Sequence, residues 1–469
     1  MTPDASLLPR TYGAAVAYCE SLLRAQTGVA GGALLAEHFQ RMGYFLERMG
    51  APQRRFASAH VAGTSGKGST SAMIGAILRA AGLRTGVHCT PYLQTPIERM
   101  QVGELYASTD EFVRLVQRLQ PHILHMQQES PYHDISYREI AVAQAFLHFA
   151  NAGVDVAAIE TGMGGRFDYT NHIQPLVSII VTVDYDHVAT LGPTLERIAR
   201  HKAGIIKDGV PAVTGVTEMA SLAVIEQEAA LHHAPLYRLG REIGQSTRSV
   251  GSGGSIFDYR SPWGPLDGLR VGMLGRHQIT NAALAATAAH LLGERGLPVT
   301  DDAIRRGLAA ARMPGRLEVI QQLPTVVLDG AHNPEKMRSL AAGLHDLFPG
   351  RRPTLVVGVL AAKQADEVLA EVVPLAATVI VTSPLVLGKP AVPADHLADV
   401  CRRLGGDVVV EPDLQAAMAR AQVLAGDHGL ICVTGSLYMV GQARELWAPT
   451  ARILAQRTSF PGNTNHRWQ

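Results

Sequence analysis

The stretch His60-Val-Ala-Gly-Thr-Ser-Gly-Lys-Gly-Ser-Thr70 lies between an apolar run, Phe56–Val61, and a helical pattern, Ser69–Ala81. A glycine-rich turn between a strand and a helix is typical of a phosphate-binding loop. Its backbone can approach the phosphates closely, and the first turn of the helix presents free N–H groups. Lys67 adds a positive charge. The stretch therefore predicts a nucleotide site in a fold where strands alternate with helices.

The loop departs from the standard phosphate-loop pattern at two positions. Val61 stands where the first glycine of that pattern would fall, and Gly68 separates Lys67 from Ser69. The alternative interpretation is a glycine-rich turn with an exposed lysine. The position between a strand and a helix favours the nucleotide site.

Strand-like and helical patterns continue to alternate after this loop. Val154–Ile159 and Leu176–Val183 are predicted buried strands, and Tyr137–Ala152 is a predicted long helix. Ser108 and Glu111 have the spacing of a capping box, which predicts a helix start. Strands separated by helices indicate an α/β fold with a doubly wound, mostly parallel sheet.

A domain boundary is expected at Met313-Pro-Gly-Arg316, because proline and glycine interrupt a helical pattern there. Five β-rich runs follow it, separated by helical patterns: Thr325–Leu328, Thr354–Val359, Thr378–Thr382, Asp407–Val410 and Gly429–Thr434. We therefore predict a phosphate-loop ATPase domain over residues 1–313 and a smaller Rossmann-like domain over residues 314–469. Within the first domain, the Gly- and Ser-rich segment 245–268 is expected to form a hairpin at Ser255–Arg260.

The composition suits a well-buried enzyme. Of 469 residues, 47% are hydrophobic and 18% charged, and the net charge is +1. With no basic field to attract nucleic acid, a phosphate-bearing ligand must be held by a local site. The four cysteines are scattered, as in a reducing compartment. We see no secretory signal or membrane helix, so a cytoplasmic protein with no membrane partner is expected.

Three further polar segments follow predicted strands, where the loops of a parallel sheet gather. The first, Glu160-Thr-Gly-Met-Gly-Gly-Arg-Phe-Asp-Tyr-Thr-Asn171, offers a carboxylate that can reach a nucleotide-bound metal. The second contains His187 and, after a Gly-Pro loop, Lys202; the third is Leu328-Asp-Gly-Ala-His-Asn-Pro334. Each has a structural alternative: a plain loop, a satisfied histidine with a solvated lysine, and a helix cap.

In this order, the segments resemble the folylpolyglutamate synthase and dihydrofolate synthase family, a branch of the Mur ligase superfamily. The resemblance runs from about Gly43 to Leu446, and its most specific parts are GTSGKGST, ETGMGGRFDYTN, PGRLE and DGAHNP. About 60 residues precede the phosphate loop, too few for the separate UDP-sugar domain of the cell-wall branch. The resemblance implies a ligase that uses ATP and Mg²⁺.

The resemblance also implies roles for individual residues that match the family's motifs. The implied ATP contacts are Gly66, Lys67, Gly68, Ser69, Asn281, Arg316 and Asp329. The implied magnesium ligands are Thr90, Glu160 and His187. Lys202 matches a lysine that the family carries as a carbamate (N6-carboxylysine). Lys67, His187 and Lys202 are accordingly the expected catalytic residues.

The pterin side of the substrate is implied to contact two segments. Their residues are Ser136, Tyr137, Arg138, Glu139, Phe167, Asp168 and Tyr169. The chain also departs from the family pattern. Ser65 replaces the usual Asn, Thr90 the usual Ser, Tyr92 the usual His, and Lys363-Gln364 the common Lys-Asp. Tyr92 lies near the expected acyl substrate. Of the implied roles, binding of the pterin acid is therefore the one on which this departure bears most.

The implied reaction joins L-glutamate to a folate or dihydropteroate carboxylate through an acyl-phosphate, and the expected state is a monomer. Two alternatives stay open at this point. One is a Mur-type amide ligase acting on a different acid. The other is a nucleotide-binding regulator without ligase chemistry, against which the presence of both Glu160 and Lys202 argues.

Overall fold

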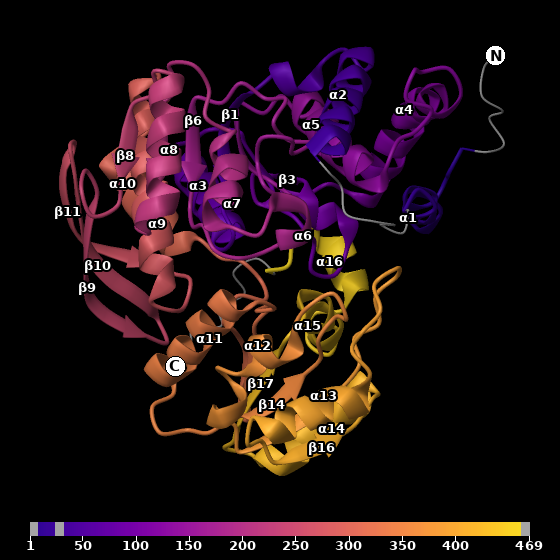
Figure 1. Ribbon diagram of the computed structural model, residues 1–469, viewed down its shortest axis with the longest axis vertical. Coiled ribbons are helices and arrows are strands. Elements are labelled where there is room, and N and C mark those ends of the chain that lie inside the picture. Colours follow the sequence, from indigo (N-terminus) through magenta and orange to yellow (C-terminus); the bar gives the residue numbers. More distant parts are fainter. Residues whose placement is uncertain (1–7, 24–31, 461–469) are drawn as a thin grey trace. The chain divides into compact units, whose positions relative to one another are not determined.

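The apolar run before the glycine-rich loop forms β1 (Ala57–Ala62), a central strand of an eight-stranded sheet in the order β4-β3-β2-β5-β1-β6-β7-β8. Its neighbours β5 (Val156–Glu160) and β6 (Val177–Ile180) run parallel to it. These three strands are buried almost throughout, as expected for a parallel sheet covered on both faces. The computed structural model, which describes residues 8–23 and 32–460, thus confirms the predicted doubly wound sheet (Figure 1).

The other strands of this sheet are short. They are β2 (Thr85–His88), β3 (Gln101–Val102), β4 (Leu105–Tyr106), β7 (Ala212–Thr214) and β8 (Leu236–Arg238). The pairs β2–β3 and β3–β4 are antiparallel, and the other pairs are parallel. The carboxyl ends of β1, β2, β5 and β6 therefore meet at one edge, where a doubly wound sheet binds its ligands.

Helices with capped starts cover the sheet. α4 (Thr109–Gln128) begins with the predicted capping box of Ser108 and Glu111, and α5 (Tyr137–Asn151) with one of Ser136 and Glu139. α3 (Lys67–Ala80) packs on β1, β2 and β5. The other helices of this unit include α1 (Tyr12–Glu20), α2 (Gly32–Arg48), α6 (Val188–Leu191), α7 (Leu195–Ala203) and α8 (Met219–Leu231). Helices α1, α2, α4 and α5 share one buried apolar cluster with β5.

A second sheet, in the order β12-β13-β17-β14-β15-β16, contains the five predicted strands of the C-terminal region. They are β13 (Thr325–Leu328), β14 (Thr354–Val357), β15 (Thr378–Val381), β16 (Val408–Val410) and β17 (Leu430–Thr434), all parallel. Its helices are α11 (Pro334–Leu347), α12 (Ala365–Leu369), α13 (Ala394–Arg403), α14 (Leu414–Ala425) and α15 (Leu437–Arg444). The antiparallel edge strand β12 (Glu318–Gln322) was not predicted, because its half-exposed Glu-Val-Ile-Gln-Gln lacks a clear apolar pattern.

The prediction of a hairpin at Ser255–Arg260 is wrong. That segment lies within β10 (Gly254–Ser261), the middle strand of a three-stranded antiparallel sheet with β9 (Gly244–Gly251) and β11 (Gly264–Val271). The strands were hard to recognise because β9 is largely polar and both tight turns are flanked by glycines. Gly254 has φ +106° and Gly264 has φ +108°, conformations that glycine adopts without strain.

The chain divides into two compact units that are not two continuous segments. The first comprises residues 1–242, 284–307 and 450–469, and the second residues 243–283 and 308–449. Helices α9 (His277–Glu294) and α10 (Asp301–Ala310) each contribute to both units. The C-terminal helix α16 (Thr450–Gln456) belongs to the first unit because Ile453 packs into its core. The predicted division at residues 313/314 is thus a simplification. No helix of the described ranges is long and apolar enough to span a bilayer.

Buried histidines give this fold a pH dependence. Burial lowers the pKa of His60 to about 3 and the pKa of His88 to about 4, whereas the unfolded chain has its histidine pKa near ~6.5. The unfolded state therefore binds more protons below pH ~6.5, so stability is fully present above that pH and is lost as the pH falls toward 4. Each such histidine contributes a slope of up to about 1.4 kcal/mol per pH unit.

We expect the urea concentration at the unfolding midpoint to decrease as the pH is lowered from about 6.5 to about 4. His88→Gln should flatten this dependence, because glutamine does not titrate. The control is His345→Gln, since the His345 side chain is 85% exposed and its loss should leave the slope unchanged. Equal slopes in the two variants would contradict the assignment.

Candidate active site

The glycine-rich loop connects β1 to α3 in a conformation suited to an anion. Gly66 has φ +79° and precedes Lys67, the first residue of α3. No side chain caps this helix start, so its first backbone N–H groups stay available to a ligand. Gly68 and Ser69 in the first turn are buried. The predicted ATP residues 66–69 are therefore grouped around one helix terminus.

Hydrogen bonds hold the loop against the segment that follows β6. Thr64 N donates to Thr182 O at 3.0 Å, and Ser65 N donates to Thr182 Oγ1 at 2.9 Å. Thr64 Oγ1 donates to Asp184 O and accepts from Asp184 N, each at 3.0 Å. Sequence reasoning did not assign a role to Thr64 or Thr182. The ladder predicts that the loop is rigid before any ligand arrives.

The Lys67 side chain lies along its own loop. Nζ donates to Gly63 O at 2.9 Å and to Thr64 O at 3.5 Å. These partners are uncharged carbonyl groups. A bound phosphate can therefore replace them as the partner of the ammonium group without breaking either of these contacts as a salt bridge.

Two oxygen ligands predicted for magnesium lie side by side. Glu160 ends β5, is 5% exposed, and its Oε2 accepts a hydrogen bond from Thr90 N at 3.0 Å. Thr90 follows β2, which is the parallel neighbour of β5. A buried carboxylate and a half-buried hydroxyl at one sheet edge suit a hard cation.

His187 lies in a strained turn beyond β6. Its backbone has φ +51°, a conformation uncommon for residues other than glycine. Its side chain is 49% exposed, and Nε2 lies 3.8 Å from Asp186 Oδ2. Among the described residues, no three His, Cys, Asp or Glu side chains are placed to hold a metal ion. The role of His187 as a ligand stays a prediction.

Lys202 is buried, with 3% exposure, in the last turn of α7. The carbonyl groups around it pack against the glycine turn after β5: Arg166 N donates to His201 O at 2.6 Å. A Cβ on Gly165 would lie 2.8 Å from Lys202 O. The structure thus excludes the solvated-lysine interpretation and places the Lys202 backbone beside the loop that carries Glu160.

The predicted substrate segment at the start of α5 contains a buried ion pair. Glu139 is fully buried, and its carboxylate accepts two bonds from Arg41, each at 2.8 Å, and one from Ser136 Oγ at 2.6 Å. Arg41 also contacts Asp134 at 2.8 Å. Glu139 therefore stabilises the helix start, whereas Arg138 is exposed. Arg41 was missed, because nothing local links it to a residue 98 positions away.

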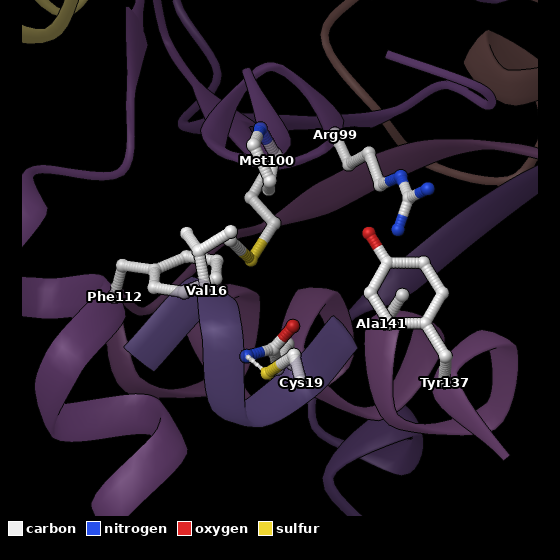
Figure 2. Close-up of a pocket in the computed structure, with 9 residues that line it drawn as sticks. Val16, Cys19, Arg99, Met100, Phe112, Tyr137 and Ala141 are labelled. Atoms are coloured by element: carbon white, nitrogen blue, oxygen red, sulfur yellow. Dashed lines mark hydrogen bonds between the residues drawn. The ribbon is translucent and has the colours of Figure 1, made fainter. Parts of the chain in front are cut away.

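Tyr137 and Tyr92 enclose the guanidinium group of Arg99. Its Cζ lies 4.8 Å from the Tyr92 ring centre and 5.1 Å from that of Tyr137, within cation–π range. Arg99 and Tyr137 line a cavity of about 10 Å³. Figure 2 shows them facing each other on one side, with Phe112 and Val16 on the opposite side. Tyr92, the departure from the family pattern, is thus a stacking partner of Arg99.

The second predicted substrate segment, Phe167–Tyr169, belongs to the loop after β5. The Phe167 ring packs edge-on against Phe39 and His201, with centroids 6.3 and 6.0 Å away. Burial raises the pKa of Tyr169 to about 12, so its hydroxyl stays neutral. Asp168 is buried and accepts hydrogen bonds from its own loop.

The second unit holds the three remaining predicted ATP residues. Asn281 Nδ2 donates to Gln278 Oε1 at 2.9 Å on α9. Asp329 is buried and accepts bonds at 2.8 Å from Leu317 N and Ala331 N. Burial raises the pKa of the Asp329 carboxyl, and the positive charge of Arg316 opposes that rise. The PGR and DGA segments are therefore neighbours, as expected, and their nucleotide contacts stay a prediction.

Comparison with known proteins adds independent information. The model of the Mur ligase middle domain matches residues 61–289, and the model of the Mur ligase glutamate ligase domain matches residues 315–437. These matches lie on either side of the predicted boundary at 313/314. The chain is 35% identical to the dihydrofolate synthase/folylpolyglutamate synthase of Bacillus subtilis over 408 residues, covering 86% of this chain and 94% of that protein.

Two solved structures are also similar along nearly the whole chain. One is the Mycobacterium tuberculosis folylpolyglutamate synthase complexed with ADP, with a TM-score of 0.86, 31% identity, and coverage of 93% of this chain and 98% of that one. The other is Escherichia coli FolC in complex with DHPP and ADP, with a TM-score of 0.80, 26% identity, and coverage of 94% and 98%.

Proposed function

The chain belongs to the folylpolyglutamate synthase/dihydrofolate synthase family of Mur ligases, and from that premise we propose that it joins L-glutamate to the carboxylate of a folate or dihydropteroate while ATP is converted to ADP and phosphate. One observation carries the proposal most directly. The uncapped start of α3 with Lys67 follows β1, and the buried Glu160 ends the neighbouring parallel strand β5 at the same sheet edge; the buried Lys202, in the last turn of α7, packs its backbone against the glycine turn after β5. The complexes of relatives with ADP and DHPP support the two substrate types.

The proposed reaction has two steps. The substrate carboxylate attacks the γ-phosphorus of ATP, so that ADP leaves and an acyl-phosphate forms. The amine of L-glutamate then attacks the acyl carbon, phosphate leaves, and the amine loses a proton to give the amide. In the first step, charge grows on the transferring phosphoryl oxygens. Lys67 and the N–H groups at the start of α3 would stabilise that charge, and the position of Lys67 Nζ along the loop supports this role.

We propose Mg²⁺ as the metal. The Thr90 hydroxyl and the Glu160 carboxylate are donor types that suit a hard cation, and Thr90 N is hydrogen-bonded to Glu160, so the two residues would hold the ion together with His187 and carbamylated Lys202 as the family implies. When bound, the ion would neutralise charge on the ATP phosphates. The hydrogen bond from Thr90 N orients the carboxylate of the buried Glu160.

The remaining alternatives make different predictions. A ligase for another acid would turn over ATP without any pterin compound, and a nucleotide-dependent regulator would turn over ATP slowly whatever acid and amine were present. The buried Lys202 disfavours the regulator, because a nucleotide switch has no need of a buried lysine at that position.

We expect ADP release to require ATP, Mg²⁺, L-glutamate and a pteroyl or folyl acid together. The measurement is a coupled ADP assay in which each component is omitted in turn, with dihydropteroate, tetrahydrofolate and unrelated carboxylic acids compared. Turnover that is independent of pterin compounds would refute the folate assignment while leaving the ligase reaction intact. Loss of activity when any one component is removed would support the folate assignment.

A further inference from the structure

A buried chain of hydrogen bonds joins the residue before the phosphate loop to the predicted substrate loop. His60 Nε2 lies 2.8 Å from Thr170 Oγ1, and Thr170 Oγ1 lies 2.5 Å from Asp168 Oδ1. His60 and Thr170 are fully buried, and Asp168 is 7% exposed. The three side chains therefore form a polar chain within the apolar interior of the first unit.

The direction of each hydrogen bond follows from the chemistry of the groups. The Thr170 hydroxyl donates its single proton to Asp168 Oδ1, which also accepts from the Thr170 backbone N–H. Thr170 Oγ1 can then only accept from His60, which requires the proton of His60 to be on Nε2. His60 Nδ1 is buried and has no hydrogen-bond partner in the described part of the chain. Protonation there would create an unpaired buried charge, which keeps His60 neutral.

This series of hydrogen bonds ends at the Asp168 carboxylate, which organises the substrate loop, residues 162–170. Asp168 Oδ2 accepts from Met163 N at 2.9 Å, and Oδ1 accepts from Thr170 N at 3.0 Å. A Cβ on Gly162 would lie 3.3 Å from Asp168 Oδ2 and 4.0 Å from Thr90 Cγ2. Gly162 thus lies close to both Asp168 and the predicted magnesium ligand Thr90, and Asp168 stands between Phe167 and Tyr169 in the sequence.

We propose that His60 and Thr170 are positioning residues that fix the Asp168 carboxylate and thereby the conformation of the substrate loop that holds the pterin acid. The pterin part of this proposal rests on the proposed function. The loop-ordering part depends only on the hydrogen bonds above. Neither residue touches the reacting atoms, so their effect passes through Asp168.

Removal of the imidazole donor should loosen the loop without changing the reacting groups. In His60→Met an apolar side chain of similar size replaces the imidazole, so Thr170 Oγ1 loses its donor. In His60→Gln the amide nitrogen can occupy the place of Nε2 and restore that donor. Thr170→Val and Thr170→Ser form a second pair, in which only serine keeps the hydroxyl that donates to Asp168. The control is His148→Met, because His148 is also buried in this unit and forms no described hydrogen bond with the loop.

The kinetic test separates positioning from a general loss of stability. We expect His60→Met and Thr170→Val to raise KM for the pterin acid by roughly tenfold, about the value of one buried hydrogen bond, with kcat and KM for ATP changed by less than about twofold. His60→Gln, Thr170→Ser and His148→Met should stay within about twofold of the parent enzyme. An unchanged KM for the pterin acid in both apolar variants, or an equal rise in KM for ATP, would overturn the proposal.

Hydrogen exchange tests the loop directly and needs no substrate. The amides of Met163 and Thr170 donate to Asp168, so peptides spanning residues 161–171 should exchange faster in His60→Met than in the parent or in His148→Met. Equal exchange in all three proteins would overturn the positioning role. Faster exchange together with an enzyme that ignores pterin acids would support loop ordering and refute the proposed substrate instead.

Discussion

Lys67→Ala is expected to reduce ADP release by roughly 100-fold or more, the loss typical of a preorganised charge aimed at a developing transition-state charge. The wild-type ammonium lies along the phosphate loop, 2.9 Å from Gly63 O, so it is already positioned before ATP binds. Loss of that charge should lower kcat much more than it raises KM for ATP, because the phosphoryl charge is greatest in the transition state.

The control for this substitution is Arg84→Ala, which also removes one positive charge but lies on the exposed surface. It should keep near-normal turnover, and circular dichroism should show that both variants are folded. Near-normal turnover of folded Lys67→Ala would contradict the phosphate-binding role and favour the alternative, a glycine-rich turn with an exposed lysine.

Lys202→Ala should bind ATP and yet turn over poorly, with a loss on the order of 100-fold for removal of a metal-supporting group. The reason is electrostatic. A plain ammonium beside Mg²⁺ would repel the ion, whereas reaction of the neutral amine with CO₂ gives a carbamate, whose anionic oxygens suit a hard cation. Lys202 is only 3% exposed, so it is not a solvated surface charge.

Chemical rescue distinguishes the carbamate from an ordinary lysine. A small carboxylate such as acetate should partly restore Lys202→Ala, because it can supply the missing oxygen ligand. Lys202→Arg should stay inactive with or without acetate, since arginine keeps its positive charge and forms no carbamate under ordinary conditions. Carbon-13 NMR of enzyme equilibrated with labelled bicarbonate, and electron density at the side chain, should show the modification. Density for an unmodified ammonium in an active, ATP-bound enzyme would refute it.

The parts of the fold that could be predicted are those in which local pattern and global structure agree. β1, β5 and β6 are short, almost completely buried runs, and buried parallel strands read as continuous apolar segments. The capping boxes before α4 and α5 have a fixed spacing, so their helix starts could be placed closely. The edge strand β12 and the polar strand β9 have half-exposed residues and no such pattern, which is why they were missed or misjudged.

The candidate site was predictable at the level of motifs and not of contacts. The glycine-rich loop and Glu160 follow strands, so their position at one sheet edge could be derived from topology. The contact of Arg41 with Glu139 bridges 98 positions, and that of Thr64 with Asp184 bridges 120, so no local pattern reveals either. Such long-range pairs depend on the tertiary packing of loops, which periodicity does not describe.

The glycine turn after β5 and the end of α7 approach each other closely at two glycines. A Cβ on Gly165 would lie 2.7 Å from His201 O, and one on Gly204 would lie 2.4 Å from Arg166 Cβ. Neither glycine has a positive φ, so what excludes alanine is space. Backbone atoms and Cβ atoms form this contact, so a change of side-chain rotamer cannot make room for an added methyl group, as it can at an ordinary core contact. A larger residue at either glycine would therefore have to displace the backbone that carries the buried Lys202.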